Sequence, residues 1–320
     1  MSIQWRPMRP KDVRGCAEII AAHPVNGARY RDDIQNLHKV WLNLLGREAF
    51  RAAAIESVDA SQRATLIGVG VSAFVNDTFL THLKTPPYRW VGPELVRQIV
   101  RGDNPLLSDQ QVRQANSQGG LNLVTWEGAL NHEFRDRPEA HTAVFSAFVE
   151  HHRGFLLKEM IAHGMSEELL AATLRSGGSL LDSEGCYTDT PGRSISEIFA
   201  APHIVGITRE LALSRVGFWI ASLFIHEAPQ FDFRPSEQRL LLTALRGGTD
   251  EELSDDLGIS LSAVKKTWSL IYERAAAHLP GFSSNHNGST NGASERGKEK
   301  KQRLLTYLRD HPEEMRPAAP

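Results

Sequence analysis

The first two thirds of the chain mix helical and strand-like hydrophobic patterns. Apolar residues recur at helical spacing after Asp12 and again within 36–54. Segments 52–58 and 65–75 are rich in apolar and β-branched residues and are separated by a polar turn, which predicts a strand pair. Another strand is predicted over 121–126. These patterns together indicate a mixed α/β, or α+β, region.

The end of this region is less distinct. Segment 143–149 fits either a strand or the start of a helix, because periodicity does not separate the two over so few residues. Helices are predicted over 155–163, 167–174 and 204–213. The apolar stretch 218–225 predicts the last strand of the region.

From Phe233 onward the pattern is helical only. Pro235 suits the first turn of a helix, since the N–H that proline lacks has no partner there. Thr249 and Glu252 have the spacing of a capping box, which starts a second helix. Gly258 permits a tight turn, and Ser260 caps a third helix.

The third helix has two contrasting faces when it is unrolled at about 100° per residue. Its inward face is predicted to carry Val264, Trp268, Ile271 and Ala275. Its outward face is predicted to carry Ser262, Lys265, Lys266 and Ser269. Lysines on such a face can meet guanine acceptors or phosphates, and serines can meet either, so these four are the candidate DNA-binding residues.

Four stretches together resemble the LuxR/GerE-type DNA-binding domain. They are 233–237 (FRPSE), 249–260 (TDEELSDDLGIS), 264–266 (VKK) and 271–272 (IY). The resemblance implies a helix-turn-helix whose recognition helix, 261–276, enters the major groove of double-stranded DNA. It also implies a bacterial transcription regulator that binds paired half-sites as a homodimer.

The segment departs from that family in composition. Arg234, Ser236, Ala263 and Thr267 stand where Thr, Arg, Thr and His are common. Segment 231–280 holds six Lys and Arg against eight Asp and Glu, so it is not basic. Phosphate contacts dominate DNA affinity, and we therefore expect weak binding by this domain alone. An alternative is a degenerate helix-turn-helix that docks another protein.

The C-terminal end adds positive charge. A run of Ser, Asn and Gly within 281–299 predicts a flexible linker. A short basic helix and tail follow over 300–320, with Leu304, Leu305 and Leu308 as an apolar stripe. Such a helix can supplement the weak charge of the DNA-binding domain.

A second resemblance concerns the N-terminal region. Arg6 and Asp12 ahead of a helix, then a strand pair, then 149–154 (VEHHRG) are similar to a GNAT acetyltransferase, whose glycine-rich loop binds the pyrophosphate of acetyl-CoA. Of that loop only Arg153 and Gly154 are present. Phe155 and Leu156 follow, and such bulky side chains block a close approach of the backbone to phosphate. We therefore expect this fold to serve sensing or dimerisation, with acyl-CoA binding as an alternative.

Composition excludes several other classes. The chain has 320 residues, 41% hydrophobic and 23% charged, with a net charge of −2, and no apolar run reaches the ~20 residues of a membrane span. Cys16 and Cys186 form no CxxC, which favours a cytoplasmic protein without disulfides. Trp90, Trp126 and Trp219 suit a ligand pocket, although tryptophans more often belong to the core.

Other chemical motifs are absent from the sequence. No G-x-S-x-G is present, so a hydrolase nucleophile has no support. Histidines are numerous in the N-terminal region but do not have metal-ligand spacing, and surface positions are expected for them. These histidines are His132, His141, His151, His152 and His163.

The sequence therefore predicts a multidomain, cytoplasmic transcription regulator that is not an enzyme. Residues 1–230 form a mixed α/β sensor-like or dimerisation region, which receives a small-molecule or protein signal, and 231–280 form an all-α LuxR-type domain. No cofactor, metal or catalytic residue is predicted. The predicted partners are double-stranded DNA and a second copy of the chain.

Overall fold

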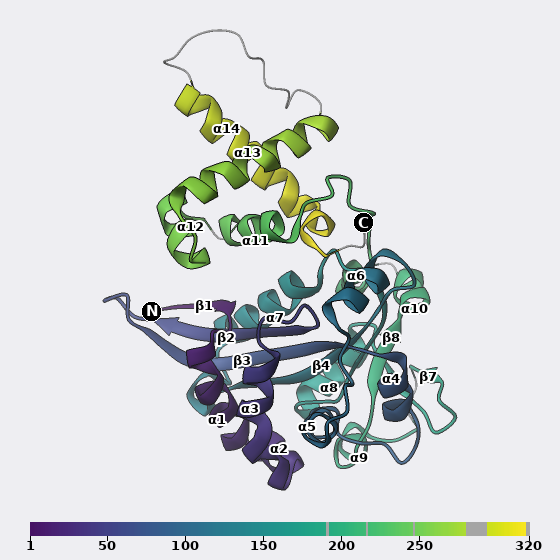
Figure 1. Ribbon diagram of the computed structural model, residues 1–320. Helices are drawn as coiled ribbons and strands as arrows, with labels where there is room; N and C mark the ends of the chain where they lie inside the picture. The colour runs from purple at the N-terminus through teal and green to yellow at the C-terminus, as the bar shows by residue number, and fades with distance from the viewer. Residues whose placement is uncertain (190–191, 216, 246, 280–292, 318–320) are drawn as a thin grey trace. The chain divides into compact units, whose positions relative to one another are not determined.

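The computed structural model describes residues 1–189, 192–215, 217–245, 247–279 and 293–317, with the backbone alone for 293–298. The chain divides into two compact units, Met1–Ile225 (unit 1) and His226–Pro320 (unit 2). Each unit is described by itself (Figure 1). The boundary lies a few residues before the predicted one at 230. Within the described residues, no helix is both long and apolar enough to cross a membrane.

Unit 1 contains one eight-stranded sheet in the order β1-β2-β3-β4-β5-β8-β6-β7. All neighbouring strands are antiparallel except β4 and β5, which are parallel. The strands are β1 (Ser2–Pro7), β2 (Phe50–Val58), β3 (Ala64–Val75), β4 (Leu121–Leu130), β5 (Leu157–Ala162), β6 (Ser179–Leu181), β7 (Tyr187–Thr188) and β8 (Val205–Thr208).

Helices cover both faces of the sheet. The α-helices of unit 1 are α1 (Val13–Ala22), α2 (Pro24–Tyr30), α3 (Ile34–Leu44), α4 (Asp77–Lys84), α5 (Val91–Arg101), α6 (Asp109–Ser117), α7 (Pro138–His152), α8 (Glu167–Arg175), α9 (Ile195–Phe199) and α10 (Arg209–Ser214). Short 3-10 helices are η1 (Pro10–Asp12), η2 (Arg31–Asp33), η3 (His132–Phe134) and η4 (Trp219–Leu223).

The side-chain alternation of β2 explains this two-sided cover. Ala52 and Ala54 belong to the large core that includes side chains of α1 and α3. Ala53 and Ile55 belong to a second core beneath α7. Successive residues of a strand point to opposite faces, so a strand covered on both sides reads as a nearly continuous apolar run. Both faces of the sheet therefore contribute to the stability of unit 1.

Three of the predicted elements of unit 1 are wrong. Segment 155–163 forms the strand β5 rather than a helix, 204–213 forms β8 followed by α10, and 218–225 forms η4 rather than a strand. β5 (LKEMIA) contains several good helix formers, but pairing with β4 and β8 overrides that local preference. The open segment 143–149 is helical, within α7.

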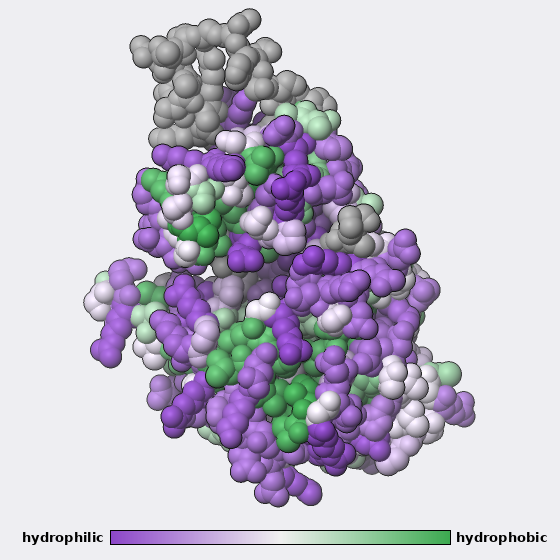
Figure 2. Space-filling model, viewed as in Figure 1, coloured by the Kyte–Doolittle hydropathy of each residue, from purple (hydrophilic) through white to green (hydrophobic). Residues whose placement is uncertain are grey.

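The surface of unit 1 also carries apolar residues. Figure 2 shows a mostly hydrophilic surface with one hydrophobic area on the visible face of unit 1, near α3 and α5 of Figure 1. Leu42 of α3 and Val100 of α5 are exposed large apolar residues. Single exposed apolar side chains of this kind are ordinary in folded proteins.

Unit 2 is helical, as predicted. It consists of α11 (Pro235–Ala244), α12 (Asp250–Leu257), α13 (Leu261–His278), α14 (Ala293–Asp310) and the 3-10 helix η5 (Pro312–Met315). Residues 281–292 of the predicted linker 281–299 lie outside the described residues, and from Ala293 the chain is helical. The apolar stripe of α14, around Leu304, belongs to the same core as Trp268 of α13.

The caps of unit 2 are those predicted. Pro235 occupies the first turn of α11. Thr249 and Glu252 form a reciprocal capping box at α12, and Ser260 accepts a hydrogen bond from the N–H of Ala263. Gly258 ends α12 with φ +65°, a left-handed conformation that favours glycine. Local sequence signals therefore fix the helix boundaries in this unit.

Candidate functional site

The four predicted DNA-binding residues lie together on one face of α13. Ser262, Lys265, Lys266 and Ser269 are all exposed. The opposite face of α13 is buried through Val264, Trp268, Ile271 and Ala275, as predicted. The four residues therefore lie on the exposed face of the helix. Their contact with DNA, and the homodimer, stay predictions.

Among its described residues, unit 2 also contains one group of side chains that could hold a metal ion. Ligand atoms of Glu227, His311 and Glu313 all lie within 4.8 Å of one another. His311 Nδ1 is 3.0 Å from Glu313 Oε1, so two of the three groups already pair with each other. No metal function is assigned to this group.

A more unusual arrangement lies in unit 1, where the parallel strands β4 and β5 diverge. Their pairing runs from Leu121 and Leu157 to Val124 and Ile161. β4 continues for six further residues to Leu130 without pairing to β5. The register of β4 against β3 also shifts after Thr125, which leaves an extra residue in β4. The divergence opens the interior of the sheet beside Glu127.

Glu127 and His163 face each other at this divergence. Glu127 lies on the unpaired part of β4, and His163 follows the end of β5. Both side chains are fully buried, and Glu127 Oε1 is 3.8 Å from His163 Nε2. Neither carboxylate oxygen and neither ring nitrogen has a hydrogen-bond partner of good geometry. Buried polar groups are nearly always paired, so two such side chains together indicate a functional site.

Burial sets the protonation of this pair. It raises the pKa of Glu127 to about 8, against the lowering effects of the Tyr30 hydroxyl and the Arg29 guanidinium. Burial also lowers the pKa of His163 well below its usual range, and the positive charge of Arg29 adds to this effect. At neutral pH Glu127 therefore holds its proton and His163 is neutral. A carboxyl that ionises just above neutrality suits proton transfer.

The C-terminal end of α2 covers the pair. The buried Tyr30 accepts a hydrogen bond from Trp126 Nε1 at 3.1 Å, and its hydroxyl lies beside Glu127. Asn26 Nδ2 donates to the carbonyl of Gly128 on β4. Arg29 Nη1 donates to the carbonyl of Gly164, beyond β5, at 2.7 Å. α2 thus bridges the two diverging strands.

His203 and Trp90 complete the surroundings. The N–H of Gly164 donates to His203 Nε2 at 2.8 Å, so Nδ1 carries the proton and donates to the carbonyl of Ala201 at 2.9 Å. The ring of Trp90 packs edge-on against both His163 and His203. These contacts hold the two imidazoles in fixed orientations.

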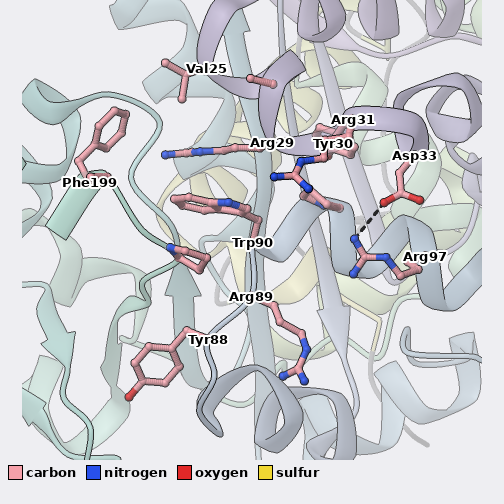
Figure 3. Close-up of a pocket in the computed structure, with 14 residues that line it drawn as sticks. Val25, Arg29, Tyr30, Arg31, Asp33, Tyr88, Arg89, Trp90, Arg97 and Phe199 are labelled. Carbon is pink, nitrogen blue, oxygen red and sulfur yellow. Dashed lines mark hydrogen bonds and ion pairs between the residues drawn. The ribbon is translucent and has the colours of Figure 1, made fainter. Parts of the chain in front are cut away.

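A pocket of about 680 Å³ lies on the outer side of this cluster. It shares Arg29, Tyr30 and Trp90 with the cluster and adds side chains that precede α5 or belong to α9. Figure 3 shows Arg29 lying over the face of Trp90, at 3.8 Å from the ring centre, and Arg97 joined to Asp33. The volume is in the range of small-molecule sites.

Part of this site was visible in the sequence. Trp90 lines the pocket, as one of the three tryptophans named for that role, whereas Trp126 is core. His163 was expected at the surface and is buried instead. Glu127 was missed, although a single carboxylate inside the apolar run 121–130 was a usable signal. Tyr30 carries no local signal, since only the tertiary fold brings it to Glu127.

The glycine loop expected at 149–154 is not formed as a phosphate loop. Arg153 and Gly154 follow the last turn of α7 and lead into the strand β5. No helix begins there, so no row of backbone N–H groups points to a phosphate. The helix that follows β4 is α7, which begins at Pro138.

Comparison with known proteins gives structural matches only. No family model matches the chain, and no curated protein matches it. Three solved acetyltransferase structures are examples of the structures that are similar to this chain. The Corynebacterium glutamicum histone acetyltransferase HPA2 and related acetyltransferase has a TM-score of 0.36 and 11% identity, covering 64% of this chain and 95% of that chain. A Staphylococcus aureus GNAT acetyltransferase has a TM-score of 0.34 and 7% identity, covering 65% and 99%.

The third is a chimera of the Vibrio cholerae spermidine N-acetyltransferase SpeG and hSSAT, with a TM-score of 0.36 and 12% identity, covering 67% of this chain and 100% of that chain. All three matches are acetyltransferases and cover about two thirds of this chain. They contradict two predictions. One is that the chain is not an enzyme, and the other is that it is a LuxR-type, DNA-binding transcription regulator.

Proposed function

We propose that unit 1 transfers an acyl group from a coenzyme A thioester to a small acceptor, with Glu127 as the general base. The observation that carries this proposal is the buried, unpartnered carboxyl of Glu127 with its pKa near 8. It lies where β4 and β5 separate, and it contacts a tyrosine that lines the pocket. A general base works best when its pKa is close to the working pH.

The residues around α7 fit coenzyme A through side chains rather than through a backbone cradle. Pro138 has no N–H, and the N–H groups of Ala140 and His141 both donate to the carbonyl of Arg137. Arg135 and Arg137 precede α7, so guanidinium groups and the helix dipole would hold the phosphates. The edge of β4 between Val124 and Gly128 does not pair with β5, and it suits the amides of the pantetheine arm, because such an edge accepts an added strand; at Gly128 the carbonyl already accepts from Asn26.

Bound coenzyme A thioester would supply the activated acyl group and the leaving thiol. The acceptor reaches the pocket as an ammonium ion, and Glu127, once ionised, removes its proton. Trp126 Nε1 donates to the Tyr30 oxygen, which leaves the Tyr30 proton free to stabilise the ionised carboxylate. The new acyl–nitrogen bond replaces the carbon–sulfur bond. The leaving thiolate would take the second proton, which the attacking nitrogen loses, and the proton on Glu127 passes to water.

The test measures release of the free thiol of coenzyme A from acetyl-CoA, with a panel of amino acids and primary amines as acceptors. The wild type is compared with Glu127→Gln and with Glu133→Gln, an exposed carboxylate that serves as a matched control. We expect a rate that rises with pH toward about 8 and that only Glu127→Gln loses, by about 10²-fold or more. Equal rates for wild type and Glu127→Gln would overturn the assignment of the base.

Binding of acetyl-CoA itself is followed by titration calorimetry. Arg137→Ala is expected to weaken it about tenfold without changing the pH profile of turnover. An unchanged affinity for acetyl-CoA would refute the proposal that the residues around α7 bind coenzyme A. Arg47→Ala, at another exposed position of unit 1, is the control.

A further inference from the structure

We propose that the pocket selects an acceptor that carries a carboxylate beside its amine, in the manner of an α-amino acid, and rejects polyamines. This inference rests on the proposed function, since it names the acceptor class of the same site. Its basis is the charge of the pocket lining, the fixed position of one arginine and the strained backbone of another.

The pocket lining is rich in unbalanced positive charge. Arg29, Arg31, Arg89 and Arg97 line the pocket, and Asp33 is the one carboxylate among the lining residues described. Asp33 is already paired with Arg97 at 3.0 Å. In the described part of the chain, the ion pairs leave the other three arginines without a carboxylate. Such a lining attracts an anion and repels a polycation.

Arg29 is held in place before any ligand arrives. Its guanidinium carbon lies 3.8 Å from the ring centre of Trp90 and 4.9 Å from that of Phe199. Its Nη1 donates to the carbonyl of Gly164, and its buried Nη2 has no partner. A planar guanidinium fixed in this way loses little entropy when a carboxylate binds it, and it is suited to recognition of planar anions.

Arg31 is held in a strained conformation. Its backbone has φ +48°, in the left-handed region that favours glycine, and its side chain is exposed at the pocket. Strain of this kind persists where a residue serves a site. Tyr30, which lies against Glu127, lines the same pocket as Arg29 and Arg31, so we expect the amine beside a carboxylate held at the arginines to lie toward Tyr30.

The test measures binding and turnover separately on the full chain. Titration calorimetry compares L-leucine, L-phenylalanine and L-glutamate with the amines that remain when the α-carboxylate is removed, and with spermidine. We expect each amino acid to bind at least about tenfold more tightly than its decarboxylated amine, and spermidine not to bind. Equal or tighter binding of the amines, tightest binding of spermidine, or no binding of amino acids at millimolar concentration would overturn the proposal.

Variants at Arg31 separate recognition from folding. Arg31→Gly relieves the backbone strain, so we expect the unfolding midpoint to stay the same or rise while amino-acid binding weakens about tenfold. Arg47→Ala should change neither. Unchanged binding by Arg31→Gly would contradict the role of Arg31.

The two proposals fail in different ways. Amino-acid binding that depends on Arg31, with no release of the coenzyme A thiol, would leave the recognition site standing and refute acyl transfer. Thiol release with simple amines that Arg31→Gly does not affect would leave acyl transfer standing and refute the carboxylate preference.

Discussion

The raised pKa of Glu127 makes a quantitative prediction about stability. The folded protein keeps the carboxyl proton up to about pH 8, whereas the unfolded chain releases it near its ordinary value of 4.5. Between these values the folded state binds more protons, so the free energy of unfolding falls as pH rises. The fall is largest at about 1.4 kcal/mol for each pH unit, and because the slope is smaller near each pKa it amounts to about 3–4 kcal/mol between pH 5 and pH 8.

The perturbation is Glu127→Gln, which keeps the shape of the side chain and removes its titration. At pH 5 the variant should resemble the wild type, and by pH 8 it should be more stable than the wild type by an amount on the order of 4 kcal/mol. His163, whose lowered pKa decreases stability as pH falls, is present in both proteins and largely cancels in the difference.

The assay is urea unfolding at pH 5, 6, 7 and 8, followed by tryptophan fluorescence. Five of the six tryptophans belong to unit 1, including the fully buried Trp41 and Trp126, so most of the emission reports the unfolding of this unit. Glu133→Gln, at an exposed position, is the control and should follow the wild type at every pH. Parallel pH profiles for the wild type and Glu127→Gln would refute the reasoning, because they would mean that Glu127 is ionised in the folded protein near neutral pH.

Two further predictions concern packing and the C-terminal unit. Gly92→Ala places a Cβ that overlaps the Tyr30 hydroxyl, so we expect thermal unfolding to show a loss of stability of about 1–3 kcal/mol. Gly70→Ala is the control and should cost less, because a Cβ there meets open space. Similar losses for the two variants would contradict the packing argument. Whether the exposed face of α13 contacts DNA is tested by fluorescence anisotropy across a salt series. Salt-dependent binding to duplex DNA that Lys265→Ala/Lys266→Ala loses would establish the contacts, and no binding by the wild type, or identical curves, would refute them.

Local chemistry explains why unit 2 was well predicted. The first turn of α11 and the caps of α12 and α13 depend on residues within four positions of each other, so the sequence displays them directly. The buried face of α13 follows from helical periodicity in the same way. What such a bundle binds depends on its exposed residues, and periodicity does not determine that.

Unit 1 depends on pairings between distant segments, which explains the errors there. β8 lies between β5 and β6, and β4 pairs with β5 in parallel, so the short strands gain their stability from partners far away in the chain. Their own residues do not separate strand from helix over four to six positions. The candidate site could not be predicted for the same reason, because Tyr30, Glu127 and His163 come from three segments that are far apart in the sequence.

The placement of unpartnered polar atoms supports a functional reading of the divergence between β4 and β5. Among the described residues, ten buried side-chain nitrogen or oxygen atoms lack a hydrogen-bond partner, and six of them belong to Asn26, Arg29, Glu127 and His163. Elsewhere in unit 1 other buried charges are paired, as where Arg6 contacts Asp12 at 2.6 Å, although the Nε of Arg51 also lacks a partner.

Each unpaired group costs about 1–3 kcal/mol, so a purely structural cluster would be expected to exchange these residues for apolar ones. Unit 1 pairs other buried charged groups with partners of opposite charge, but it leaves these atoms of the cluster without hydrogen-bond partners. A site kept open for a substrate explains why the cost is concentrated there.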